Sequence, residues 1–208
     1  MDTFQEIAEE RRAVADLLAG LTREQQAVQS LCHEWTVHEV AAHLVLPLVV
    51  STPRFVLTML VCRGSFDRAN VRLTREQARR PFAEIVDVLR RKAGTRFTPP
   101  GSGPEAPLTD VLVHGLDIRW PLGLTRRVPA ERLRTSLTHL TAAPRSGLVP
   151  KGLLDGLRFE ADDVGWAAGR GPTVSGPAEA LLLAITGRTA ALDLLEGDGA
   201  AALRSRLS

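Results

Sequence analysis

Apolar residues recur at helical spacing over much of the first 120 positions of the chain, with charged and polar residues between them. The segment from Phe4 to Leu21 is the first amphipathic helix in this pattern, and the apolar segment from Leu108 to Trp120 is the last. Residues 98–107 are rich in proline and glycine and predict a surface loop before that last helix.

Three Thr-x-x-Glu/Gln sequences predict further helix starts, because the threonine hydroxyl can accept a hydrogen bond from a free backbone amide. They begin at Thr22, Thr36 and Thr74. The helix after Thr36 should run to about residue 61, kinked or divided by Pro47 and Pro53, and the helix after Thr74 to about residue 92. Amphipathic helices that each bury one apolar stripe favour an antiparallel four-helix bundle.

The pattern changes in the last third of the chain. Pro129 sits where a helix would begin, and leucines at helical spacing follow over residues 130–142. Beyond Gly147, short alternating runs at residues 157–161 and 164–166 predict a small sheet, and helices are expected at residues 178–186, closed by Gly187, and after a capping Asp198. We therefore expect a mainly α protein, with a helical bundle over residues 1–145 and a small α/β domain over residues 146–208.

Composition excludes several classes of function. A formal charge of +2 and basic clusters that never form one stripe argue against a DNA-binding regulator, so no nucleic-acid partner is expected. The most apolar run, residues 40–50, is too short to span a membrane. Two cysteines make no disulfide framework, and the acidic start, Met1 to Glu6, is unlike a signal peptide, so we expect a cytoplasmic protein.

The histidines carry the candidate chemistry. Asp110 and His114 are spaced i, i+4 and share one helix face, with Asp117 one turn further along nearly the same line. His43 lies in an apolar run of another helix, and a divalent cation shared by the three side chains would offset the cost of burying them. The alternative is that each histidine is a hydrogen-bonded core residue, because an Asp-x-x-x-His pair is common by chance.

Three stretches of the chain carry a resemblance to a known family. They are Cys32-His33-Glu34-Trp35-Thr36-Val37-His38-Glu39-Val40-Ala41-Ala42-His43-Leu44, then Asp110-Val111-Leu112-Val113-His114-Gly115-Leu116-Asp117-Ile118 with Pro121-Leu122-Gly123, and residues 175–188. In order and spacing the chain resembles the mycothiol-dependent maleylpyruvate isomerase family. That family belongs to the DinB/YfiT-like superfamily of metal-binding four-helix bundles.

The resemblance implies a site and a chemistry. It places a divalent metal, zinc in type, on His43, Asp110 and His114, although the isomerases have Glu where this chain has Asp110, which leaves metal identity and occupancy open. It makes Asp117 a residue that orients His114.

The resemblance also implies partners. Mycothiol is the implied cosubstrate, its thiolate attacks a small electrophilic substrate in isomerisation or thiol transfer, and Arg188 is a candidate for holding an acidic group of the thiol or substrate. A solvated arginine at a helix end is the alternative for Arg188. A non-catalytic metal- or ligand-binding member of the same fold remains the alternative function, and the chain could be a monomer or a homodimer.

Overall fold

A computed structural model describes residues 2–142 and 147–208. The chain divides into two compact units, Met1–Thr125 and Arg126–Ser208. The division falls before the expected domain boundary at residue 145, because the helix at residues 130–142 packs against elements of the second unit.

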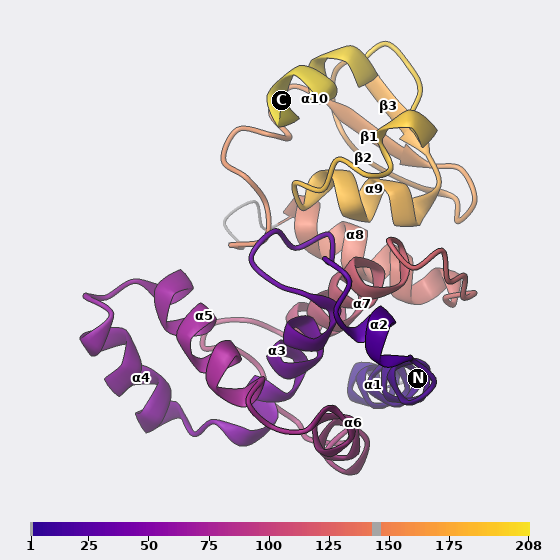
Figure 1. Cartoon of the computed structure of the whole chain (residues 1–208). Helices are drawn as coiled ribbons and strands as arrows, with labels where there is room; N and C mark the ends of the chain where they lie inside the picture. The colour runs from indigo at the N-terminus through magenta and orange to yellow at the C-terminus, as the bar shows by residue number, and fades with distance from the viewer. Residues whose placement is uncertain (1, 143–146) are drawn as a thin grey trace. The chain divides into compact units, whose positions relative to one another are not determined.

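Every helix or strand element that the structure describes in the first unit is a helix, and an isolated β-bridge joins Gln29 and Thr36. Its helices are α1 (Thr3–Ala19), α2 (Arg23–Gln26), α3 (Val37–Val49), α4 (Thr52–Val61), α5 (Phe66–Gln77), α6 (Phe82–Arg91) and α7 (Glu105–Arg119). Helices α1 and α3 each pack against both α6 and α7, which makes these four the bundle, and α5 packs on the outside of α3 (Figure 1). The predicted four-helix bundle is confirmed.

The bundle is held together by the apolar stripes that the sequence pattern indicates. Leu18 of α1, Val40 of α3, Leu89 of α6 and Ile118 of α7 are completely buried in one hydrophobic cluster. Removing apolar surface of this kind from water contributes about 25 cal/mol for each Å². The packing therefore fixes the rotation of α3 and α7 about their own axes, and with it the direction of the polar side chains they carry.

Two of the three predicted helix starts are confirmed as capping boxes. Thr22 and Thr36 each accept a backbone hydrogen bond from the residue three positions later, whose side chain bonds back to the threonine amide. The prediction at Thr74 is wrong, because Thr74 lies inside α5, which begins after a Ser65 cap. The next helix, α6, begins after Pro81.

The long helix expected after Thr36 is divided rather than kinked. Helix α3 ends at Val49, the backbone is extended at Val50, and α4 starts with Pro53 in its first turn, where a proline costs no hydrogen bond. Pro47 is accommodated near the end of α3. The division at residues 50–51 lets α4 leave the bundle.

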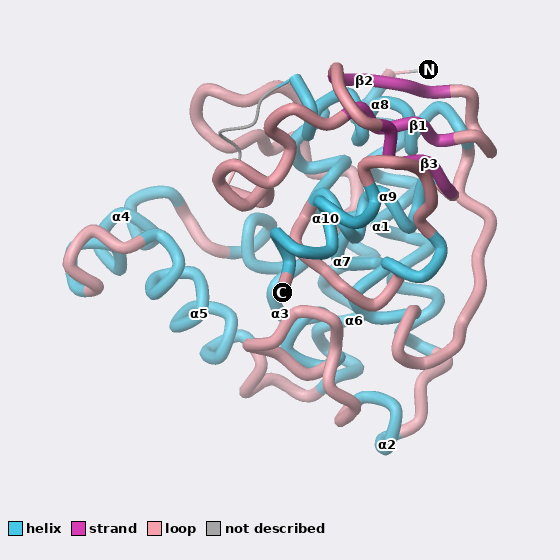
Figure 2. Tube along the Cα trace, turned by 90° about the horizontal axis from the view of Figure 1, so that it is seen from above, coloured by secondary structure: helices cyan, strands magenta, loops and turns pink. Residues whose placement is uncertain are grey.

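The second unit joins helices to a small sheet. Its elements are α8 (Ala130–Ala142), β1 (Arg158–Ala161), β2 (Trp166–Gly169), β3 (Thr173–Gly176), α9 (Ala178–Ile185), the 3-10 helix η1 (Leu192–Leu194) and α10 (Ala200–Leu207). The strand order is β2-β1-β3, with β1 antiparallel to β2 and parallel to β3 (Figure 2). The almost wholly buried α9 packs against α8, β1 and β3, so the expected small α/β part is confirmed.

Details of the second unit differ from the sequence-based expectation. Strand β3 was not expected, because Thr173–Gly176 follows a glycine-rich turn and is too short to show a clear alternation. Gly187 does close α9, with a left-handed φ of 84° that favours glycine. The cap expected from Asp198 is wrong, since α10 begins after Gly199 with no side-chain cap. Among the described residues, none of the helices has the length and hydropathy needed to cross a bilayer.

Candidate metal centre

Helix α3 holds His43 against the bundle with both ring nitrogens directed at polar groups. The Trp35 ring stacks on the His43 ring, with centroids 4.6 Å apart and an interplanar angle of 25°. The His43 Nδ1 lies 3.4 Å from the hydroxyl of the fully buried Thr74 on α5. The Nε2 atom faces Asp110 on α7, at 3.7 Å from Oδ1. Stacking on one side and the hydroxyl at Nδ1 together leave Nε2 as the nitrogen available to a metal.

Helix α7 supplies the other two polar side chains from one face. Asp110 and His114 are one turn apart, and the Nε2 of His114 lies 3.5 Å from the same Oδ1 of Asp110. Asp117, one turn further along, places Oδ2 2.9 Å from the Nδ1 of His114, and its side chain is fully buried. An Nδ1–H that donates to a carboxylate leaves the Nε2 lone pair free, so Asp117 sets the tautomer that a metal ligand needs.

The three side chains converge on one point inside the first unit. One ligand atom each from His43, Asp110 and His114 lies within 4.8 Å of the others. Ligands about 2.0–2.2 Å from a tetrahedral zinc ion stand roughly 3.3 Å apart, so the two histidine–aspartate distances of 3.7 and 3.5 Å need to shrink by only a few tenths of an ångström. The shorter Asp110 side chain therefore still reaches the common point.

The site is open on one side. The side chains of His43 and His114 are only 11% and 5% exposed, whereas that of Asp110 is 32% exposed. Three protein ligands leave at least one coordination position of a zinc-type ion unfilled. Asp110 is thus the most exposed of the three converging side chains.

The electrostatics prepare the site for a cation. Burial lowers the pKa of His43, which keeps the imidazole neutral. Burial by itself would raise the pKa of Asp110, but its contact with His43 and the nearby His114 and Arg11 outweigh that effect and lower the pKa to about 2. Neutral imidazole and ionised carboxylate are the forms that bind metals.

Arg11 is a buried cation behind the site that the sequence did not single out. It is 4% exposed, and its guanidinium donates to the carbonyl oxygens of Ala93 and Thr95 at 3.0 and 2.8 Å. Burial lowers the pKa of Arg11, and the negative charge of Asp110 acts in the opposite direction. Its place in the amphipathic α1 gave no sign of this role, because arginines on a helix are usually solvated.

The sequence also missed how Trp35 and Thr74 serve the site. Trp35 lies in the motif that carries His43, but the packing of its ring on that histidine needs the turn between α2 and α3 to bring them together. Thr74 looked like a helix cap. A completely buried hydroxyl at the ninth position of a helix is a better indicator of a polar neighbour than of a cap.

Arg188 belongs to the second unit, just after α9. Its guanidinium donates to the carbonyl oxygen of Thr186 at 2.7 Å. Its contact with a thiol or substrate stays a prediction.

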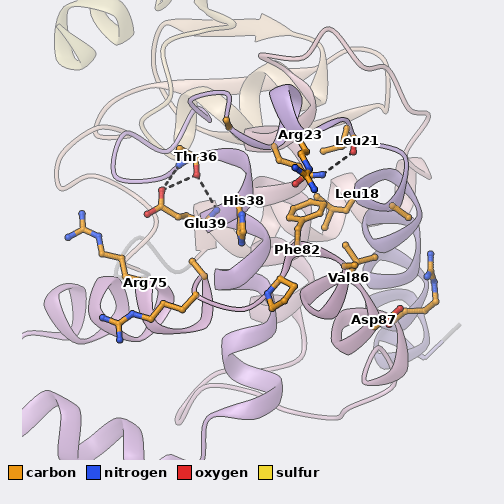
Figure 3. Close-up of a pocket in the computed structure, with 18 residues that line it drawn as sticks. Leu18, Leu21, Arg23, Thr36, His38, Glu39, Arg75, Phe82, Val86 and Asp87 are labelled. Carbon is orange, nitrogen blue, oxygen red and sulfur yellow. Dashed lines mark hydrogen bonds between the residues drawn. The ribbon is translucent and has the colours of Figure 1, made fainter.

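A surface hollow lies elsewhere in the first unit, and none of the three converging side chains lines it. It measures about 1060 Å³ and is bordered by residues of α1, α2, α3, α5 and α6, with Phe82 and the edge of His38 at its centre (Figure 3). The capping box of Thr36 and Glu39 forms part of its wall. The hollow is therefore separate from the candidate metal centre.

Comparisons with known proteins agree with this architecture. Two solved structures, a mycothiol-dependent maleylpyruvate isomerase and a histidine-to-alanine mutant of such an enzyme, are each similar over 96% of this chain and 97% of theirs. Each has a TM-score of 0.51 and 17% sequence identity, which shows a shared fold. No curated protein matches the chain.

The family comparison reaches further, because it covers most of the first unit. The model described as the mycothiol maleylpyruvate isomerase N-terminal domain matches residues 7–119, more than half of the 208 residues. The matched span runs from α1 to the end of α7 and contains all three converging side chains as well as Asp117. The chain belongs to the mycothiol maleylpyruvate isomerase N-terminal domain family.

Proposed function

We propose that this protein is a metal-dependent enzyme that uses a low-molecular-weight thiol, mycothiol, as the nucleophile toward a small electrophilic substrate. The observation that carries the proposal is the convergence of His43, Asp110 and His114 on one partly open point of a bundle of this family. The solved relatives named as mycothiol-dependent maleylpyruvate isomerases suggest the thiol and one substrate to test.

The residues of the chain would hold a divalent ion, zinc in type, through two imidazole nitrogens and one carboxylate oxygen. Such an ion, when bound, favours the thiolate form of a nearby thiol, which is the nucleophilic form. Asp117 keeps His114 in the required tautomer, and the Thr74 hydroxyl and the Trp35 ring hold the His43 ring in place. The chain itself supplies no nucleophile in this scheme.

The chemistry follows from the thiolate. It adds to a carbon of a cis double bond conjugated with a carbonyl group, and the electron pair moves to the carbonyl oxygen. The former double bond is now a single bond and can rotate. Expulsion of the thiolate then restores the double bond in the trans geometry, so the thiol is regenerated. With a substrate that carries a leaving group, the same attack ends in transfer of the thiol.

Within this proposal the C-terminal part, expected from residue 146 onward, contributes Arg188. Its planar guanidinium can form two parallel hydrogen bonds to a carboxylate of the thiol or substrate. Replacing Arg188 by Ala should raise the KM for the thiol or the acidic substrate at least tenfold, whereas Arg170→Ala, at an exposed arginine of the same part, should leave it unchanged. Equal KM values for the two variants would remove Arg188 from the scheme.

The metal part of the proposal is tested by elemental analysis of the purified protein. We expect about one divalent ion in each chain after zinc loading and removal of excess ion, and loss of that ion in His43→Ala and His114→Ala. His33→Ala is the matched control, because His33 lies in the same motif but is exposed. A wild-type protein that holds no metal under these conditions would refute the proposal.

The enzymatic part is tested against the alternative, a metal-binding member of the fold without turnover. The shorter Asp110 motivates that alternative, because it changes the distance between ligand and metal. The assay incubates the loaded protein with mycothiol and maleylpyruvate, or with a panel of electrophiles, and separates the products by chromatography. Conversion that needs the thiol and disappears in His114→Ala supports the enzyme, whereas bound metal without conversion supports the alternative.

A further inference from the structure

Among the described helices of ten or more residues in the first unit, α4 is the one that buries none of its residues. It packs against α5 and, together with α5, lies at the edge of the first unit, away from α1, α6 and α7 (Figures 1 and 2). A helix of apolar composition with one packing partner leaves an apolar face without a cover.

The uncovered face forms one contiguous surface, which we call the α4 patch. It consists of Val56, Leu57, Leu60 and Val61 of α4 and Phe66 at the start of α5. These residues are 50–70% exposed, and among the described residues the next most exposed large hydrophobic residue is Leu194 in the second unit, at 48%. Phe66 is continuous with α4 through a ring contact with Phe55, at 5.3 Å between centroids.

The spacing within the patch is that of a helix–helix contact. The four α4 residues occupy positions i, i+1, i+4 and i+5, which fall on two neighbouring rows along one side of a helix. Such double rows pack into the groove of a facing helix. This spacing therefore favours packing of the face against another helix over exposure to solvent.

The charge pattern selects among the occupants that could cover it. Arg54 is the one charged residue between Thr52 and Cys62, and its guanidinium is paired with Glu76 of α5. The rim beyond α4 carries both signs, with Arg63 followed by Asp67. The α4 patch itself carries no charged side chain, so two copies of this face can meet without repulsion.

The apolar area of the α4 patch matches that of an interface between two copies of the chain. Five side chains at this exposure present on the order of 500 Å² of apolar surface, at the upper end of what a typical monomer exposes in one patch. A standard interface buries about 800 Å² on each partner, somewhat more than half of it apolar. The α4 patch thus supplies about the whole apolar area of one such interface.

We propose that the α4 patch is the docking surface for a second copy of this chain, which forms a two-fold symmetric dimer in which the α4–α5 pairs of the two copies pack together. A two-fold interface uses the same patch on both copies, as a single uncovered face requires. Helix α5 then lies between the dimer contact and α3, and it carries the Thr74 that faces His43. The contact between copies therefore stabilises the position of α5, whose Thr74 hydroxyl lies next to the His43 ring.

The first experiment measures mass as a function of concentration, by analytical ultracentrifugation of the full chain. Wild-type protein is expected to be dimeric at micromolar concentration. Leu60→Glu, at the most exposed position of the patch, should raise the dissociation constant at least 100-fold with an unchanged circular dichroism spectrum. Leu194→Glu is the matched control at the exposed leucine outside the patch and should remain dimeric.

The second experiment locates the contact. In a background with Cys32 and Cys62 replaced by Ser, Leu57→Cys should be linked to its own copy by a short bifunctional maleimide, and Leu194→Cys should not. A wild-type chain that stays monomeric at every concentration would overturn the proposal. So would a dimer that Leu60→Glu leaves intact, or Leu60-dependent binding of a monomer to phosphatidylcholine–phosphatidylglycerol vesicles.

Discussion

The hydrogen bond between Asp117 and His114 offers the sharpest test of how the bundle prepares its metal ligands. The Asp117 carboxylate is fully buried and lies 2.9 Å from the Nδ1 of His114. Asp117→Asn keeps the size of the side chain and an oxygen that can accept the N–H, but it removes the negative charge. The imidazole becomes a weaker base, and the amide can also turn its NH₂ toward the ring, which favours the wrong tautomer.

Two independent estimates of the loss in zinc-binding free energy caused by Asp117→Asn agree. A hydrogen bond to a charged group contributes about 1.5–3 kcal/mol. Loss of the partner of a ligating histidine typically lowers metal affinity about 10–100-fold, which equals about 1.4–2.8 kcal/mol at 25 °C. We therefore expect the dissociation constant for zinc to rise by one to two orders of magnitude, while the metal-free variant remains folded.

Competition with a chromophoric chelator measures this dissociation constant directly. Glu39→Gln is the matched control, because it makes the same carboxylate-to-amide change in the same bundle, at a capping box that glutamine also satisfies. The reasoning fails if Asp117→Asn, folded by circular dichroism, binds zinc within twofold of wild type, or if Glu39→Gln weakens binding equally.

Three further predictions concern stability. Thr36→Ala removes the capping hydroxyl of α3 and should lower the free energy of unfolding by about 1 kcal/mol in urea titrations, whereas Thr36→Ser should not. Leu89→Ala opens a cavity at a fully buried position and should cost about 2–5 kcal/mol in the same assay; a cost below 1 kcal/mol would contradict the packing. Because burial lowers the pKa of His43, the unfolded chain takes up a proton first, and metal-free protein should lose stability as the pH falls below about 6.5. Asp110, with its pKa of about 2, adds a stabilisation that is lost only as the pH falls from about 3.8 toward 2. His43→Ala should abolish the first loss and reduce the second, because the contact with His43 helps to lower the pKa of Asp110.

Local features of the chain were readable from the sequence because they depend on neighbours within a few residues. The capping boxes at Thr22 and Thr36 and the helix after Pro129 each need only backbone groups close by, and all are present. The shared face of Asp110 and His114 follows from 3.6 residues in each helical turn. A local pattern that fits both a helix start and a helix interior gives a wrong prediction when the second case applies. This happens at Thr74, where Thr-x-x-Gln occurs inside a helix that Ser65 caps.

Contacts between distant segments were decided by the tertiary structure. The pairing of His43 with Asp110 depends on the packing of α3 against α7. The roles of Trp35, Thr74 and Arg11 arise from the turn before α3, from α5 and from α1. An apolar helix pattern shows that a face avoids water but not which surface covers it. For that reason the sequence predicted a helix from Thr36 to about residue 61 that its prolines kink or divide, but not that the second half leaves the core. Only the structure shows a buried α3 followed by an α4 whose apolar face is open.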